Sequence, residues 1–155
     1  MTDSIHSALW EWFAQCNSIT KLFFNFSTAQ DSDTVITTAG DSVLEEYIDG
    51  SQRRRYAFEV SRFCPISFLQ NDSGNVDMLE DAQAISAWVE EQNAIGNLPK
   101  LPEGSTAEAV VLLDEYAGYV TAQNESIAKY MIPFALDYHK ERMIKHGTDR
   151  KNHQR

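Results

Sequence analysis

Four histidines and two cysteines are the side chains of this chain best suited to act as nucleophiles, bases or metal ligands. His139, His146 and His153 recur every seven residues, and a helix would separate neighbours by about 10 Å, too far to share one metal ion. Cys16 and Cys64 lie on or beside apolar stretches, which favours buried, unreactive thiols over nucleophiles. No HExxH, CxxC, GxSxG or glycine-rich phosphate-binding motif occurs. The sequence therefore predicts a protein that is not an enzyme and holds neither a metal nor a cofactor.

Acidic residues outnumber basic ones, and the two are unevenly distributed. The 155 residues carry 13 Lys/Arg against 23 Asp/Glu, a net charge of −10. Residues 139–155 contain six Lys/Arg and two acids, a net +4, so the rest of the chain carries −14. An acidic body argues against a general nucleic-acid binder, because such proteins concentrate positive charge on phosphates. Neither a membrane-spanning apolar run nor a secretory signal pattern is visible, so we expect no membrane partner.

The run Arg53-Arg54-Arg55 is the one basic cluster in the acidic body. Guanidinium groups bind carboxylates and phosphates in a fixed forked geometry, so the run is a candidate contact with a partner. Charge at this position would also protect an exposed strand edge from unwanted pairing. The sequence leaves both interpretations open.

Hydrophobic periodicity predicts the elements of the first half. Steps of three and four residues predict a helix over 5–16, with Asp3 or Ser4 as its N-cap. Alternating patterns predict strands near 21–27 and 34–39, joined as a hairpin, and a third strand over 55–63. Segment 43–48 fits either a strand or a single helical turn.

The second half is predicted to contain one long helix and two long strands. The helix follows the polar turn 71–74 and ends at Gly96, and the strands cover 109–121 and 127–138. Pro133 should lie at an edge or bulge, or turn its nitrogen away from the neighbouring strand. The order α-β-β-β-α-β-β predicts an α+β fold, an antiparallel or mixed sheet with two helices on one face.

We expect a single domain over residues 1–141 and a basic C-terminal tail over 142–155. The apolar content of the tail falls after Ile144, so we expect it to be mobile in a free subunit. Lys140, Arg142 and Lys145 are then candidates for contact with a neighbouring acidic chain, and DNA is the competing partner.

Three stretches resemble, as a set, a known family. They are YIDGSQRRRYAFEVSR (47–62), WVEEQNAIGNLPKLPEG (88–104) and AGYVTAQNESIAKYMIPFALDYHKE (117–141). In order and spacing they resemble the tail-terminator, or tail-completion, proteins of long-tailed phages and prophages of Gram-positive bacteria, which are often labelled minor capsid proteins. The resemblance covers residues 5–141 and leaves the basic tail outside.

The resemblance implies a viral structural protein with no catalytic residues. Such a subunit would join a hexameric ring on the tail tube, stop polymerisation of the tube protein and dock the head-side connector or stopper protein. It would be assembled in the host cytoplasm and lie in the neck of the virion, with DNA passing through the ring without sequence-specific binding. An acidic channel wall fits that passage, because it repels phosphates.

A cyclic ring needs two different complementary patches on each subunit. Besides the basic candidates, the proline-stiffened loop 97–104 should present Leu98 and Leu101 at an exposed tip, where docking costs little entropy. Two alternatives stay open: another neck component, such as a head-completion or stopper protein, and a small ligand-binding domain or enzyme whose pocket combines distant residues.

Overall fold

The computed structural model describes residues 4–26, 30–31, 33–65, 74–113, 119–122 and 127–142. The elements in chain order are α1 (Ile5–Phe13), β1 (Lys21–Phe24), β2 (Asp33–Glu46), β3 (Gln52–Pro65), α2 (Gly74–Ile95), β4 (Ser105–Leu112), β5 (Tyr119–Ala122) and β6 (Ile127–Lys140). The basic tail from residue 143 onward, including Lys145, lies outside the described residues.

The strands form one mixed sheet in the order β1-β2-β3-β6-β4, and β5 also pairs with β6. The prediction of an α+β fold with a mixed sheet is confirmed. The strand predicted over 109–121 corresponds to β4 and β5, which follow the same partner: Leu112 pairs with Phe134, and Tyr119 pairs with Met131. The undecided segment 43–48 begins as strand, because β2 continues to Glu46.

The predicted hairpin between the first two strands is wrong, because β1 pairs with β2 in parallel. Lys21 lies opposite Asp33, and Phe24 lies opposite Ile36. A parallel arrangement requires the chain to return along the length of β1 before β2 begins. Since β1 has only four residues, that return covers about 13 Å, which the connection between the strands can span.

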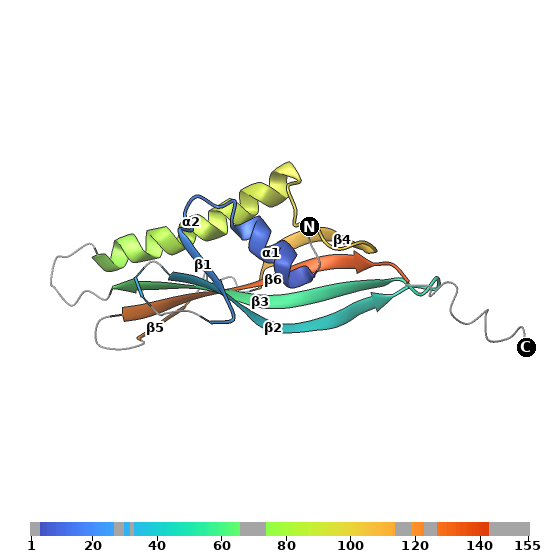
Figure 1. Ribbon diagram of the computed structural model, residues 1–155, viewed down its shortest axis with the longest axis horizontal. Coiled ribbons are helices and arrows are strands. Elements are labelled where there is room, and N and C mark those ends of the chain that lie inside the picture. The colour runs from blue at the N-terminus through green and yellow to red at the C-terminus, as the bar shows by residue number, and fades with distance from the viewer. Residues whose placement is uncertain are drawn as a thin grey trace, which may run out of the picture.

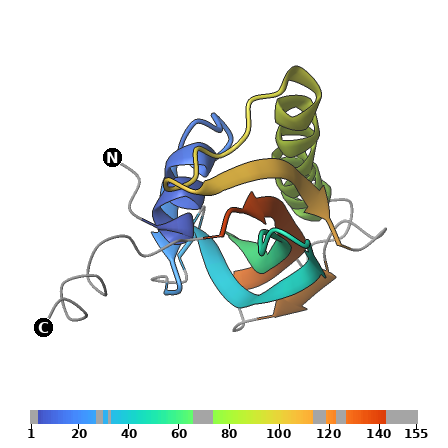
Figure 2. The same cartoon turned by 90° about the vertical axis from the view of Figure 1, so that its right-hand side faces the viewer.

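Both helices lie above the sheet in Figure 1, and their buried residues meet one face of it. Ser4 is the N-cap of α1, where its hydroxyl accepts a hydrogen bond from the Ser7 backbone N–H. Phe13 of α1 contacts Phe58 of β3 and Phe134 of β6, ring against ring. The end-on view shows how strongly the sheet curves beneath the helices (Figure 2). Helix α2 contributes a further set of buried residues: Ala82, Ile85 and Val89.

Pro133 occupies a central strand, and the neighbouring strand accommodates it. Its carbonyl accepts a hydrogen bond from the backbone N–H of Leu113, immediately after β4 ends. In an antiparallel ladder the N and O atoms of one residue point to the same side. The proline nitrogen therefore faces the point where β4 stops and is turned away from β3. This is the third of the placements that the sequence left open.

Candidate assembly surface

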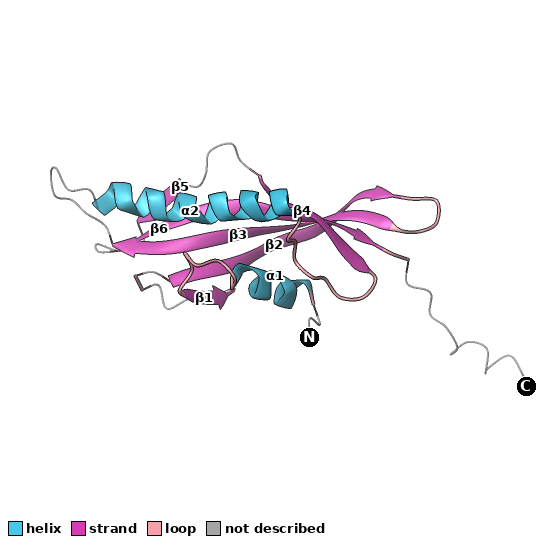
Figure 3. Cartoon of the chain, turned by 90° about the horizontal axis from the view of Figure 1, so that it is seen from above, coloured by secondary structure: helices cyan, strands magenta, loops and turns pink. Residues whose placement is uncertain are grey.

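The β2–β3 hairpin projects beyond both helices at one end of the molecule (Figures 1 and 3). We call residues 41–50 the hairpin arm. Every residue from 41 to 49 is exposed, in contrast to the buried start of β2. Four large apolar side chains lie on the arm, with exposed fractions of 46% for Val43, 40% for Leu44, 41% for Tyr47 and 108% for Ile48. An apolar cluster at a projecting tip is typical of a surface that contacts another chain.

Two irregularities in the register of β2 and a tight turn shape the arm. The pairing with β3 shifts between Thr38 and Gly40 and again between Val43 and Glu45. Such bulges increase the local twist and redirect side chains, and Leu44 lies at the second one. The turn closes through the Tyr47 N–H, which donates to the Ser51 carbonyl at 2.9 Å. Gly50 adopts φ +88°, a left-handed conformation that favours glycine.

Asp49 fixes the turn and stays charged. Its Oδ1 accepts hydrogen bonds from the backbone N–H of Ser51 at 2.9 Å and from the Ser51 hydroxyl. These hydrogen bonds lower the pKa of Asp49, because they favour the ionised carboxylate. The arm therefore presents a formal negative charge beside its apolar side chains.

The three arginines of the run lie in β3, paired with residues 42–45 of the arm, and each has a carboxylate partner within its own chain. Arg55 makes a two-pronged contact with Asp137 of β6, at 2.7 and 2.9 Å. Arg53 donates to Glu108 of β4 at 2.8 Å, and Arg54 to Asp41 of β2 at 3.3 Å. The hydrogen bond to Asp137 raises the pKa of Arg55.

These ion pairs give the arginines a structural role within their own chain. A contact with a partner would have to form in addition to these ion pairs or replace them. Asp137 is 4% exposed, so removing Arg55 would leave a buried carboxylate poorly compensated. Sequence reasoning missed the partners Asp41, Glu108 and Asp137. Glu108 is the residue skipped at the register shift of β4 between Ala107 and Ala109, and its side chain reaches Arg53.

The loop 97–104 does not have the exposed tip that the sequence predicted. Leu98 and Leu101 are only partly exposed, and Leu101 packs against the core. The Asn97 carbonyl accepts a hydrogen bond from the Trp12 indole at 2.9 Å, which ties the loop to α1. Pro99 is buried, so the prolines stiffen a segment that already packs on its own chain. Contact of the two leucines with another chain stays a prediction.

The edge strand β4 is partly covered by a side chain from α2. Asn93 Nδ2 donates to the Val110 carbonyl at 2.7 Å, and Asn93 Oδ1 accepts from the Val110 N–H at 2.9 Å. The amide group thus replaces a neighbouring strand at this residue and makes edge-to-edge pairing there unfavourable. Sequence reasoning did not single out Asn93.

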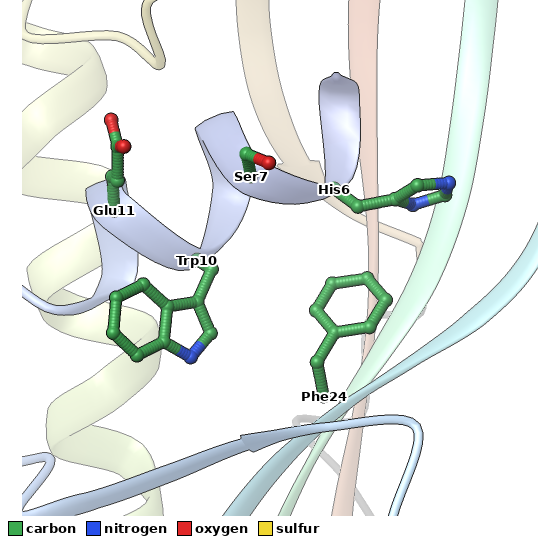
Figure 4. Close-up of a pocket in the computed structure, with 5 residues that line it drawn as sticks. All are labelled: His6, Ser7, Trp10, Glu11 and Phe24. Carbon is green, nitrogen blue, oxygen red and sulfur yellow. The ribbon is translucent and has the colours of Figure 1, made fainter. Parts of the chain in front are cut away.

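A shallow pocket of about 330 Å³ lies between α1 and β1. Figure 4 shows Trp10 and Phe24 facing each other across it, with His6 beside Phe24 and Glu11 pointing away from both rings. His6 Nδ1 lies 2.6 Å from the Tyr56 hydroxyl, which itself donates to Thr38 Oγ1 at 3.1 Å. These two contacts link α1 to β3 and β2 through Tyr56. Trp10 is 44% exposed, so this region is a second apolar surface distinct from the arm.

Both cysteines are buried free thiols, as the sequence predicted. Burial raises the pKa of Cys64 to about 11 and also raises that of Cys16, so both remain protonated near neutral pH. Among the described residues, no cluster of three His, Cys, Asp or Glu side chains is arranged to hold a metal ion. No helix within the described ranges is long and apolar enough to cross a membrane.

Lys140 and Arg142 are exposed at the end of β6, next to the turn of the arm. Comparison with known proteins adds no family assignment: no family model matches the chain, and no curated protein matches it significantly.

Proposed function

We propose that this chain is a structural subunit of a phage neck, which forms a ring on the tail tube, ends tube polymerisation and joins the tail to the head. The observation that carries the proposal is the hairpin arm, with its apolar side chains exposed at a projecting tip. A solitary chain gains nothing from exposing Ile48 and Leu44, whereas a ring subunit can bury them against its neighbour.

The three stretches that resemble tail-terminator proteins support the proposal by their positions. Residues 52–62 of the first stretch belong to β3, and residues 127–140 of the third form β6, its partner along all 14 residues of β3. The second stretch covers the end of α2 and the loop leading into β4, the other neighbour of β6. The resemblance therefore follows one contiguous part of the fold.

A head-to-tail ring needs a second, different patch on the same subunit. The region of α1 and β1 offers one, since Trp10 is 44% exposed and Phe26, just after β1, is 68% exposed. The hairpin arm and this region come from different parts of the fold, so a contact between them could repeat around a ring. The acidic body suits a channel through which DNA slides without binding.

Native mass spectrometry and negative-stain imaging of the purified chain test the proposal. We expect a six-membered ring with a central opening, which also shortens tubes when added to the polymerising tail-tube protein. Ile48→Asp should abolish the ring while the circular dichroism spectrum stays unchanged. Ile95→Asp is the matched control, because Ile95 is 68% exposed at the end of α2 and lies outside both patches. A chain that stays monomeric at every concentration contradicts the proposal.

Another neck component is the alternative within the same class, and the hairpin arm supports it equally. The two differ in their partner: a terminator binds the tail-tube protein, whereas a head-completion or stopper protein binds the head-side connector. Gene order separates them too, since a terminator gene is expected just before the tail-tube gene. Binding to the connector alone would favour the alternative.

A further inference from the structure

We propose that, in the free subunit, the apolar hairpin arm is covered by the C-terminal segment of the same chain, residues 143–155, which replaces the expectation from the sequence that this segment is mobile there. The arm exposes Val43, Leu44, Tyr47 and Ile48, and within the described part of the chain none of them packs against the core. The segment lies outside the described residues, and its first two residues, Met143 and Ile144, are apolar.

The chain leaves β6 beside the turn of the arm, which places the segment within reach. Lys140 pairs with Gln52, and the rings of Tyr47 and His139 lie 6.1 Å apart. The Arg142 side chain lies directly against Gly50, where an added Cβ would come within 2.6 Å of Arg142 Cδ. Thirteen further residues extend up to about 45 Å, more than the length of the arm. Docking is therefore intramolecular, at a high effective concentration.

Charge complementarity favours this segment as the occupant. It carries Lys145, Arg150, Lys151 and Arg155 against the single acid Asp149. The arm itself carries four carboxylates and no Lys or Arg, and the β3 residues opposite it include Arg53, Arg54 and Arg55. Asp41 is paired with Arg54, but Glu45, Glu46 and Asp49 form no ion pair with any described lysine or arginine. Each exposed pair contributes little, but several pairs beside a small apolar contact act together.

Docking of residues 143–155 on the arm does not depend on the proposed function. The effect of this docking on assembly does rest on that function. If the arm is the part of the subunit that a neighbour buries, then the neighbour must displace the segment. The segment would slow self-assembly of free subunits without preventing it, and a ring template, such as the end of a tail tube, would accelerate assembly by providing a better contact.

Disulfide trapping in the full chain tests the cover. Ser42→Cys places a thiol on the exposed arm, and Asn152→Cys places one in the segment. The native Cys16 and Cys64 are 2% and 5% exposed and stay unreactive. Ala87→Cys with Asn152→Cys is the matched control, because Ala87 is exposed on α2 beside the acidic pair Glu90 and Glu91. A neutral tail, with the substitutions K145Q, R150Q, K151Q and R155Q, gives the rate of disulfide formation that tethering alone produces.

We expect the Ser42→Cys pair to form its intrachain disulfide about fivefold faster with the native tail than with the neutral tail. For the control pair on α2, the rate of disulfide formation should differ less than twofold between the native and the neutral tail, which is about the effect of diffuse electrostatic attraction. Equal rates for native and neutral tails would overturn the proposal, as would equal acceleration at α2. Products linking two chains, with no intrachain disulfide, would overturn it in favour of docking on a neighbour. Ring formation by the untrapped chain tests the proposed function separately.

Discussion

The helix-covered half of the sheet and the hairpin arm contain the same two strands, β2 and β3, held by different forces. In β2 the first four residues are buried and the last eight are exposed. Around the covered half, rings from α1, β3 and β6 pack together in the core. At the arm, the strands are held by ion pairs, by hydrogen bonds and by the turn at Gly50.

The difference separates stability from recognition along a single hairpin. Apolar burial in the covered half stabilises the fold, since each large ring leaves water completely. The polar network alongside the arm fixes its direction and adds less free energy, because Arg53 and Arg55 are about a third exposed. The arm can therefore change its partner contacts without loss of the fold.

Core and tip substitutions should give the largest contrast. Phe58→Ala is expected to lower the free energy of unfolding by about 3–5 kcal/mol, because Phe58 is 1% exposed and contacts three other rings. Ile48→Ala should change it by less than about 0.5 kcal/mol, since its side chain is fully exposed. Urea denaturation measures both. Similar losses for the two variants would show that the arm is part of the cooperative core.

Tyr138 lies where the two regions meet, and it should make the fold sensitive to high pH. Burial, followed by its hydrogen bond to Asp41, raises the pKa of Tyr138 to about 12. Its contribution is fully present below the unfolded value of about 10 and is lost as the pH rises towards 12. The native chain should lose about 2–3 kcal/mol more than Tyr138→Phe between these limits.

Unfolding free energies of the native chain and Tyr138→Phe, measured from pH 8 to pH 12, test this expectation. The comparison cancels the titration of lysines and of the other tyrosines, which both proteins share. Parallel pH profiles would mean that Tyr138 ionises as easily in the folded chain as in the unfolded one. At pH 8 the variant should lose about 1 kcal/mol, from the missing hydrogen bond to Asp41.

The smallest effect should come from the polar network. Arg55→Ala is expected to cost about 1–2 kcal/mol, because it leaves the buried Asp137 with only Arg53 at 3.8 Å. Arg53→Ala should cost less than about 1 kcal/mol, since Arg53 and Glu108 are both about a third exposed. Thermal unfolding distinguishes the two. An Arg53 effect as large as that of Arg55 would show that burial of Asp137 does not decide the difference.

The structure also changes how the arginine run can be tested as an interface. Replacing Arg53, Arg54 and Arg55 together by Glu places a like charge beside buried Asp137, so loss of assembly would then include loss of stability. Substitution of Arg53 alone disturbs the fold least and is the better test of a partner contact. Leu98 and Leu101 have the same difficulty, because they are partly buried in their own chain.

The sequence by itself determined the elements that a local pattern encodes. Apolar spacing predicted both helices, and alternation predicted the central strands. The missing N–H of Pro133 limited it to an edge, a bulge or a nitrogen turned away from the neighbouring strand, and the sequence left these three open. These features depend on how often side chains return to the same face, about every 3.6 residues in a helix and every two in a strand. Local backbone geometry sets this repeat, so a short stretch of sequence is enough to recognise it. The buried thiols followed from their apolar neighbours.

Only the tertiary structure decided which distant residues meet. The parallel pairing of β1 with β2 depends on where the chain returns, and the strand pattern is the same in either direction. The partners of Arg53 and Arg55 lie 55 and 82 positions away, and Asn93 reaches Val110 across 17. Such contacts depend on the register between strands, where a shift of one residue moves every side chain to the opposite face.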